Sequence, residues 1–445
     1  MTESFFGTDG IRGKALEGLL ASLSVSRFGR ALGLLARERS KEPHPRVLLA
    51  RDPRTSGPEL VEAMTAGLVA AGARVLDAGV LPTPAAAWTG ERRDAALTVI
   101  ISASHNPPGD NGIKVFQPGA RKLDDAGERF VEEHYATFPE AELPAGFATK
   151  DLDALAAYLD ALAASEQGGR LDGLVVVTDA GFGAAAGIGS KLLERLGARV
   201  VALHDVPDGE RLGVGTGAVF PDVVAAAVKR EGAHVGVAWD GDADRALFAD
   251  AQGNVRDGDS VLYILGRAFA ARNELAGGAL VGTSMTNGGL RVALQASNVT
   301  LECVDAVGDR FIAERLRAKG YVLGGEPSGH VIATRWLRTG DGLFTALAVL
   351  REMRRARASL AELCRGFERF PQLLEAEPAK PGKPPLAGLV LETVERRAAE
   401  LERLGGRLVV RYSGTEPLLR VMAEGPPSAD LAAIVRSVRE AYRKA

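Results

Sequence analysis

The chain has 445 residues, 46% of them hydrophobic and 25% charged, which is typical of a folded globular protein with room for about three domains. A net charge of -3 and the lack of a long basic run argue against nucleic acid as a partner. Cys303 and Cys364 are the only cysteines, which excludes a disulfide framework and a thiolate metal cluster.

The N-terminal segment M-T-E-S-F-F-G-T-D-G has no positively charged stretch followed by an apolar one. An uncharged apolar run of about 18 residues, the minimum for a membrane span, is also missing. We therefore expect a cytoplasmic protein with no membrane partner. The glycine-punctuated run Phe6 to Gly13 delivers Arg12 to a loop, which by itself says little.

One pattern occurs three times: an apolar strand, a polar or glycine-rich loop, a helix and a second strand. The strands that begin the copies lie at 47–50, 174–177 and 279–281. In the first copy, Pro58 opens the helix, where its missing N–H would be unpaired in any case. Copies more than 100 residues apart are too distant for a solenoid, so the pattern predicts three related α/β domains.

The run Leu97 to Ile101 is apolar and β-branched, which predicts a buried strand, and Pro107-Pro108-Gly109 stops it. Between them, S-A-S-H-N places the hydroxyl of Ser104 beside the imidazole of His105 at the strand exit. The plain alternative is a turn in which Ser104 and Asn106 bond their own backbone. The other polar loops of the chain favour a nucleophile.

The second polar loop is D-G-D-A-D-R, which follows the predicted strand Val235 to Trp239. Its carboxylates, Asp240, Asp242 and Asp244, can converge because small residues separate them. Such hard oxygen ligands suit Mg²⁺ or Ca²⁺, and the lack of nearby cysteine or histidine argues against zinc. An acidic turn in solvent is the alternative, and Arg245 beside it weakens that interpretation.

The third loop, G-G-E-P-S-G-H, follows a strand predicted over Gly320 to Leu323. Glu326 and Ser328 offer an acceptor and a donor of the kind that sugar hydroxyls require. His330 alone could equally be structural, since a neutral histidine often just satisfies a backbone group. Beside Glu326 and Ser328, a functional role is favoured.

After Phe370 the composition changes, and the proline-rich stretch Glu375 to Pro385 predicts a surface connection or loop. A helix near 389–404, strands at 407–410 and 418–422 and a last helix from Ala429 predict a small α+β domain. Between these strands, R-Y-S-G-T-E-P could hold a phosphate dianion or be a plain turn. The candidate phosphate ligands are Arg411, Ser413, Gly414, Thr415 and Arg420.

Together these loops resemble the α-D-phosphohexomutase superfamily. The forms S-A-S-H-N-P, F-G-T-D-G-I-R-G and R-Y-S-G-T-E-P-L-L-R-V-M resemble its phosphoglucosamine mutase branch, and the motifs extend from Phe6 to Met422. The resemblance implies three mixed-sheet α/β domains plus a smaller C-terminal domain around a central cleft. We expect their boundaries at 1–150 (phosphoserine loop), 151–250 (metal loop), 251–369 (sugar loop) and 370–445 (phosphate loop).

The resemblance also implies roles for the loops. Ser104 would carry a phosphoryl group, and the three aspartates would hold one Mg²⁺ with the phosphoserine as fourth ligand. Glu326 and Ser328 would bind sugar hydroxyls, and the loop from Arg411 would bind the substrate's non-reacting phosphate. Residues expected at the reacting centre or reaching the sugar are Arg12, Lys114, Arg245, His330, Asp309 and Arg310.

The implied reaction interconverts glucosamine 6-phosphate and glucosamine 1-phosphate through a 1,6-bisphosphate, which feeds amino-sugar nucleotide and cell-wall precursor synthesis. Glucose- or glucosamine-1,6-bisphosphate would act as activator. For the general base, Lys114 and His105 are the candidates, with His330 behind them. The oligomeric state stays open, a homodimer included.

The resemblance leaves other functions to be weighed. A phosphoglucomutase or phosphomannomutase of the same superfamily is the nearest one. Pro327 stands where the phosphoglucosamine branch usually has glutamine, and the stretch 207–220 also departs from its pattern. A metal-dependent serine phosphohydrolase would need neither the phosphate loop nor the sugar loop. A non-catalytic sugar-phosphate binding protein would need neither Ser104 nor the complete set of aspartates.

Overall fold

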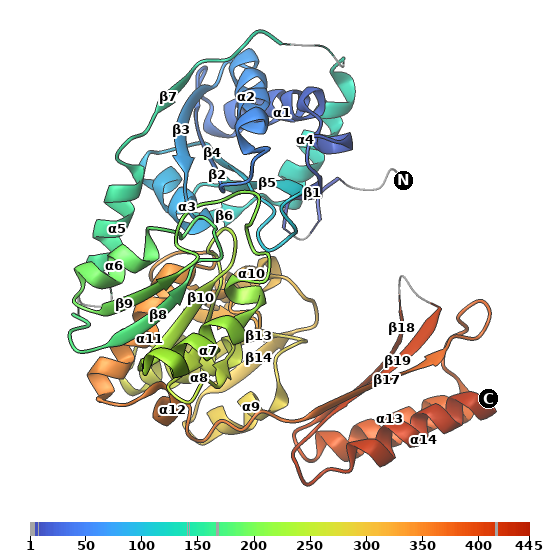
Figure 1. Ribbon diagram of the computed structural model, residues 1–445. Helices are drawn as coiled ribbons and strands as arrows, with labels where there is room; N and C mark the ends of the chain where they lie inside the picture. Colours follow the sequence, from blue (N-terminus) through green and yellow to red (C-terminus); the bar gives the residue numbers. More distant parts are fainter. Residues whose placement is uncertain (1–4, 8, 140, 142, 166–168, 414–416) are drawn as a thin grey trace.

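The computed structural model describes residues 5–7, 9–139, 141, 143–165, 169–413 and 417–445. Within them the chain forms four sheets, and we call each sheet with its helices a domain, numbered I to IV along the chain (Figure 1). The predicted fold class, three related mixed-sheet α/β domains and a smaller α+β domain, is confirmed. Among the described helices, none combines the length and apolar character that a bilayer span requires.

Domain I has the strand order β1-β5-β4-β2-β3-β7, with β6 paired to β5. The pairs β2–β3, β2–β4 and β3–β7 are parallel, whereas β1 and β4 run antiparallel to β5. Its strands are β1 (Ile11–Lys14), β2 (Arg46–Arg51), β3 (Arg74–Val80), β4 (Leu97–Ile101), β5 (Asp110–Gln117), β6 (Arg121–Lys122) and β7 (Ala148–Lys150). The helices are α1 (Ser22–Ser40), α2 (Gly57–Ala70), α3 (Thr83–Arg92), α4 (Asp125–Thr137) and α5 (Ala154–Ala164), with a 3-10 turn at Gly18–Leu20.

The alternation of β2 explains why helices cover both faces of this sheet. Val47 and Leu49 enter one hydrophobic cluster, with residues of α1, α2 and α4. Leu48 and Ala50 point the other way, into a cluster that includes residues of α3 and α5. All four side chains are fully buried, so the strand reads as continuously apolar.

Domain II has the strand order β12-β11-β10-β8-β9, in which β8 is parallel to β9 and β10, and β11 is antiparallel to β10. Its elements are β8 (Val175–Asp179), α6 (Gly189–Arg195), β9 (Arg199–Leu203), the 3-10 turn Gly217–Val219, α7 (Pro221–Glu231), β10 (Val235–Trp239), β11 (Ala246–Asp250) and β12 (Val255–Arg256).

Domain III has the order β14-β13-β15-β16, with β16 antiparallel to β15. Its elements are α8 (Gly258–Ala271), the 3-10 turn Ala276–Gly278, β13 (Ala279–Thr283), α9 (Gly288–Gln295), β14 (Thr300–Val304), α10 (Asp309–Lys319), β15 (Leu323–Gly325), β16 (Val331–Ala333), α11 (Gly342–Ala356) and α12 (Leu360–Leu363). The strand expected over Gly320 to Leu323 thus lies slightly later, because Gly320 ends α10 in a left-handed conformation.

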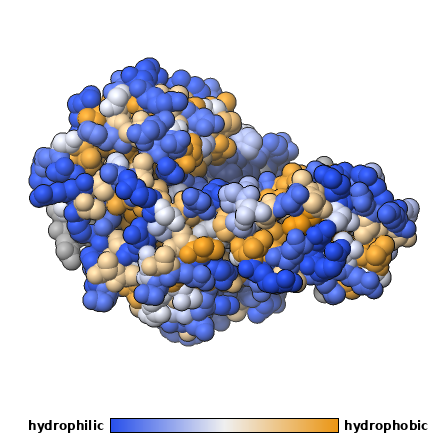
Figure 2. All heavy atoms as spheres, turned by 90° about the horizontal axis from the view of Figure 1, so that it is seen from below, coloured by the Kyte–Doolittle hydropathy of each residue, from blue (hydrophilic) through white to orange (hydrophobic). Residues whose placement is uncertain are grey.

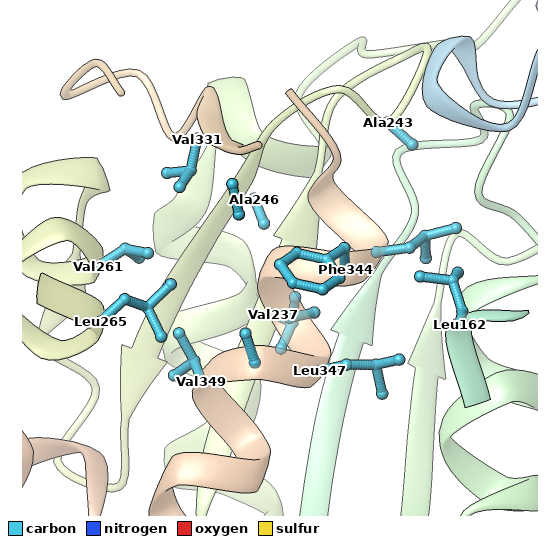
Figure 3. Packing of buried hydrophobic residues seen from close by; sticks show 14 of the residues in the cluster. Leu162, Val237, Ala243, Ala246, Val261, Leu265, Val331, Phe344, Leu347 and Val349 are labelled. Carbon is cyan, nitrogen blue, oxygen red and sulfur yellow. The ribbon is translucent and has the colours of Figure 1, made fainter. Parts of the chain in front are cut away.

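The largest hydrophobic cluster is shared by domains I, II and III. Helix α11 carries Phe344 and Leu347 into it, and Figure 3 shows both close to Val237 of β10, with α8 contributing Leu265. The indole N–H of Trp239 donates to the carbonyl of Gly342 at 3.0 Å. This common core fixes the three domains around one another.

Domain IV is an antiparallel sheet in the order β17-β19-β18, covered by two helices and holding its own hydrophobic cluster. Figures 1 and 2 show it projecting from the body formed by the other domains. Its elements are β17 (Gln372–Pro378), α13 (Gly388–Glu402), β18 (Arg407–Tyr412), β19 (Leu418–Glu424) and α14 (Leu431–Lys444).

The proline-rich connection predicted over Glu375 to Pro385 is partly wrong, because Glu375 to Pro378 belong to β17. The strand tolerates Pro378 because β17 is at the edge of the sheet and pairs only with β19. The predicted helices and the two strands of the tail are confirmed, with ends shifted by a few residues.

Candidate active site

Ser104 lies just beyond the end of β4 and is fully buried. Its φ of +52° is in the left-handed region, which a residue with a Cβ seldom adopts. The hydroxyl of Ser102 holds this turn, since it accepts from the Ser104 N–H at 3.0 Å and donates to Asp52 at 2.6 Å. The local structure therefore positions the Ser104 hydroxyl stiffly at the strand exit.

Arg54 holds the same loop in place by hydrogen bonds to its backbone. Its fully buried guanidinium donates to the backbone carbonyls of Ser104 and Asn106, both at 2.8 Å, and to those of Pro107 and Asp110 at 2.5 and 2.9 Å. Its Nε donates to Asp52 at 3.0 Å. Sequence reasoning missed this residue, although R-D-P-R directly follows β2, the neighbour of β4 in the sheet.

The Ser104 hydroxyl faces the acidic loop of domain II, where it donates to Asp240 at 2.6 Å. Asp240, Asp242 and Asp244 are all buried, and one carboxylate oxygen of each lies within 4.8 Å of the others. The loop that presents them turns at Ala243, whose φ is +58°. The predicted convergence of the three carboxylates is thus present in the structure.

The donor set fits a hard divalent cation. It consists of carboxylate oxygens and a hydroxyl, the ligands that Mg²⁺ prefers. One buried oxygen of Asp242 has no hydrogen-bond partner in the structure, which is costly unless a cation binds there. Burial, together with the charges of Asp244 and Asp242, raises the pKa of Asp240 well above its usual value.

Lys114 of β5 enters the acidic loop from domain I. Its ammonium group lies 2.7 Å from Asp242 and 3.1 Å from both Asp244 and Asp9. Burial acts to lower its pKa, but these three carboxylates outweigh it and hold the Lys114 pKa well above the usual value. Lys114 is therefore a fixed positive charge here, which argues against its being the general base.

His105 has the opposite character. Its ring is exposed to the pocket, and Nδ1 lies 3.3 Å from the Ser104 hydroxyl. Partial desolvation and the positive charges of Arg245 and Arg12 lower the His105 pKa to about 4. The imidazole is thus neutral near pH 7 and can accept a proton.

His330 of domain III is buried between two carboxylates, with Nδ1 3.5 Å from Asp244 and Nε2 3.2 Å from Asp309. Burial lowers its pKa, but Asp244 and Asp309 raise it to about 10. The two carboxylates favour the imidazolium, whereas the Gly340 N–H, 3.1 Å from Nε2, would donate to that nitrogen in the neutral ring. A Cβ at Gly340 would lie only 2.4 Å from this ring, so glycine is required at that position.

Two arginines complete the positive lining. Arg12 donates to the side chain of Asn106 at 3.0 Å and pairs with Asp9. The Arg245 N–H donates to Asp240 at 3.1 Å, and its guanidinium lies 3.7 Å from Asp244. An antiparallel bridge between Arg245 and His330 joins the metal loop to the sugar loop.

Glu326 and Ser328 lie on the loop between β15 and β16. The Glu326 carboxylate accepts from the Gly308 N–H at 3.1 Å and from the Ser328 hydroxyl at 3.3 Å. A pocket of about 530 Å³ opens in front of Glu326, which is a suitable size for a small ligand. Residues from domains I, II and III line it, among them Arg12, His105, Asp244, Arg245, Asp309, Glu326 and His330.

Asp309 and Arg310 separate in the structure. Asp309 lines the pocket and accepts from Lys122 at 2.5 Å, and Lys122 also pairs with Asp9. Arg310 points away from the pocket, to ion pairs with Asp125 and Glu128 of α4. Lys122 and Asp9 were not anticipated, because they are 113 positions apart and because the Lys122–Asp309 pair depends on how domains I and III meet.

The described residues of the predicted phosphate loop are not part of this pocket. Arg411 of β18 and Arg420 of β19 are paired residues of these two neighbouring strands. The backbone carbonyl of Ser413 accepts a hydrogen bond from the Lys383 ammonium group at 2.5 Å. Gly414 and Thr415 lie outside the described residues. Among the described residues of domain IV, none lines the 530 Å³ pocket.

Models of the phosphoglucomutase/phosphomannomutase family match nearly the whole chain. Alpha/beta/alpha domain I matches residues 3–142, domain II residues 156–253, domain III residues 257–370 and the C-terminal domain residues 367–441.

Curated relatives match along their full length. A phosphoglucosamine mutase from Novosphingobium aromaticivorans is 41% identical, with 100% of both chains covered. One from Thermobifida fusca is 42% identical over 94% of this chain and 93% of its own.

Among solved structures, a phosphoglucomutase/phosphomannomutase family protein from Burkholderia thailandensis shares the fold, with a TM-score of 0.78, 24% identity and coverage of 98% and 97%. An Aspergillus fumigatus N-acetylphosphoglucosamine mutase, solved in complex with GlcNAc-6P and magnesium, has a TM-score of 0.62 and 16% identity, with coverage of 99% and 95%.

Proposed function

The chain belongs to the phosphoglucomutase/phosphomannomutase family, and within it we propose a course for its reaction, the interconversion of glucosamine 6-phosphate and glucosamine 1-phosphate. The assignment to glucosamine phosphates rests on full-length relatives of about 40% identity that are named phosphoglucosamine mutases. The single observation that carries the proposed chemistry is the Ser104 hydroxyl on the Asp240 carboxylate.

Ser104 carries the phosphoryl group. A phosphoserine bears nearly two negative charges at neutral pH, so it requires cations around it. Arg12, Lys114 and Arg245 provide them, and the carbonyl bonds of Arg54 keep the loop in place. These residues act by position and charge, which is the main need of phosphoryl transfer.

Asp240, Asp242, Asp244 and the phosphorylated Ser104 would hold one Mg²⁺. When bound, the ion neutralises charge on the transferring phosphoryl group. In the absence of the ion, Lys114 supplies positive charge to Asp242 and Asp244.

His105 takes the proton from the sugar hydroxyl as that oxygen forms its bond to the phosphorus of phospho-Ser104 and the serine oxygen leaves. The neutral ring beside the serine oxygen supports this role over Lys114 and His330, which are both held as cations. In the return step the serine oxygen attacks the other phosphate of the 1,6-bisphosphate, the bond from that phosphorus to the sugar oxygen breaks, and protonated His105 returns its proton to this oxygen.

Glu326 and Ser328 hold the sugar while its two ends exchange places. Domain IV must then move so that Arg411, Ser413, Gly414, Thr415 and Arg420 reach the non-reacting phosphate, and this closure also excludes water. Glucose- or glucosamine-1,6-bisphosphate restores phospho-Ser104 when the group is lost. The active unit is a monomer or a homodimer.

The test begins with dephosphorylated protein, which is incubated with Mg²⁺ and glucosamine 1,6-bisphosphate. We expect a phosphate mass on the Ser104 peptide and mutase activity, and neither in Ser104→Ala. A Ser297→Ala control keeps both. Full mutase activity of Ser104→Ala would contradict the scheme.

The substrate is tested with glucosamine, glucose and mannose phosphates, each with a trace of its bisphosphate. We expect glucosamine phosphates to have the highest kcat/KM. A wide preference for glucose or mannose phosphates would overturn the assignment, and Pro327 in the sugar loop would then be the first residue to exchange.

A further inference from the structure

A second cavity, of about 350 Å³, lies where domains I and III meet. The hairpin of β5 and β6 lines one side and α10 the other, and the two elements lie near each other in Figure 1. Asp309 lines both this cavity and the active-site pocket, so the two are neighbours on opposite sides of the Lys122–Asp309 pair. The reaction proposed above does not use the second cavity.

Three exposed arginines line this cavity: Arg121 of β6, Arg317 of α10 and Arg338 beyond β16. In the described part of the chain, none of them forms an ion pair. Two other cations of the lining differ, since Lys122 pairs with Asp309 and Arg310 with Glu128. The acidic residues of the lining, Asp124, Asp309 and Glu314, pair with Arg39, Lys122 and Arg310, so the three arginines have no ion-pair partner among the described residues.

Arg121 and Arg338 are also held close together. A nitrogen of each lies within 3.6 Å of the position that a Cβ would take at Gly119. Arg121 donates to the carbonyl of Pro118 at 3.0 Å, and Arg338 lies at 3.4 Å from that of Gly119. Carbonyl dipoles offset a guanidinium charge only in part, so two like charges at this spacing favour an anion between them.

A helix dipole accounts for Arg317, whereas the guanidinium groups of the other two arginines donate to carbonyls of the turn between β5 and β6. Arg317 lies in the last turn of α10, where a cation interacts favourably with the helix dipole. Arg121 is in a two-residue strand and Arg338 in a loop, where no such dipole exists. Their convergence therefore points to a ligand.

The rest of the lining sets the kind of anion. Ala313 and Tyr321, which lie beside the buried Leu123 and Leu316, give the cavity an apolar part that a bare inorganic phosphate would not use. Its volume suits a small organic molecule. We infer that this cavity binds a phosphate ester with a flat, weakly polar body, of the nucleotide class, with its phosphates on the arginines.

The probe for this inference is ADP, titrated by calorimetry into the full chain with no added metal and with saturating glucosamine 6-phosphate, which fills the active-site pocket. We expect one ADP per chain, and binding weaker by about 10-fold or more in Arg121→Ala and in Arg338→Ala. Arg129→Ala removes an exposed arginine of α4 that does not line the cavity, and should bind ADP like the parent. Adenosine and inorganic phosphate alone should both bind more weakly than ADP.

Three results would overturn the inference: no ADP binding by the parent chain, equal binding by all variants, or loss of binding when glucosamine 6-phosphate is present. The outcome is independent of the proposed mutase reaction, because the readout is binding. Both cavity variants should keep the turnover of glucosamine phosphates.

Discussion

The Ser104 hydroxyl of domain I donates a 2.6 Å hydrogen bond to Asp240 of domain II, across 136 positions of the sequence. Both residues follow a buried strand, and the shared hydrophobic core fixes how the ends of β4 and β10 face each other. The proposed phosphoryl carrier and the proposed metal site thus come from different domains, and the proposed reaction requires both.

Asp240→Asn tests this relationship. An asparagine can still accept the Ser104 hydrogen bond, but it removes a charge from the metal site. We expect Mg²⁺ affinity to fall and kcat to drop by about 100-fold or more, with little change in melting temperature. Chelation should abolish the parent's activity, and added Mg²⁺ should restore it. Parent-like activity of Asp240→Asn at low Mg²⁺ would remove Asp240 from the metal site.

Arg54→Ala tests the support beneath the serine loop. It leaves Asp52 buried without its ion pair and four carbonyls without their donor, a loss on the order of 3 to 5 kcal/mol. We expect a lower melting temperature and faster hydrogen exchange in β4. Arg54→Lys keeps the charge but cannot span the four carbonyls, so it should fold and lose kcat.

The matched control for Arg54 is Arg51→Ala. Arg51 is the last residue of β2, three positions before Arg54, but it is only half-buried. It donates to the Asp52 carbonyl at 3.0 Å. Its loss should cost far less stability. Equal effects of the two alanine variants would refute the role of Arg54.

Ser104 and the three aspartates could be predicted from the sequence because each follows a run of apolar residues that makes a recognisable strand. In each case a short polar motif directly follows the strand, so the local sequence alone is enough to recognise it. Arg54, Lys122 and Asp9 could not be predicted in this way. Their roles depend on carbonyls and carboxylates that are distant in sequence, and nothing in the local pattern marks them. The orientation of domain IV could not be predicted either, since it depends on contacts between residues distant in sequence, such as Asn287 and Glu424.

The two histidines of the site should differ in charge. His105 has a pKa lowered to about 4 and is neutral above that pH, whereas His330 has a pKa raised to about 10 and is protonated below that pH. Nitrogen NMR of the dephosphorylated, metal-free protein from pH 5 to 8 should show His105 as a neutral ring and His330 as an imidazolium throughout. The variants His105→Gln and His330→Gln assign the signals. A His105 signal that titrates near its usual pKa of 6.5 would contradict the lowering of its pKa by desolvation and by Arg245 and Arg12.

Asp259 should make stability depend on pH where domains III and IV join. Its buried carboxylate accepts from the Asn287 N–H at 3.0 Å, and the Asn287 side chain donates to Phe370 and Glu424 of the following segments. Burial, then the charge of Asp257, raises the Asp259 pKa from 3.8 to about 7. Between these values the folded chain binds a proton that the unfolded chain has lost, so the stabilisation is complete below pH 3.8 and is lost as the pH rises through about 7.

We therefore expect the melting temperature of the parent to fall between pH 5 and 8 more steeply than that of Asp259→Asn, which has no group to titrate there. The full difference corresponds to about 4 kcal/mol. Asp208→Asn removes an exposed carboxylate whose pKa is lowered, so it should leave the slope unchanged in this range. If the melting temperatures of the parent and of Asp259→Asn change equally with pH, the Asp259 carboxyl is already ionised throughout this range. The contacts of Asn287 would then hold domain IV whether or not Asp259 carries a proton.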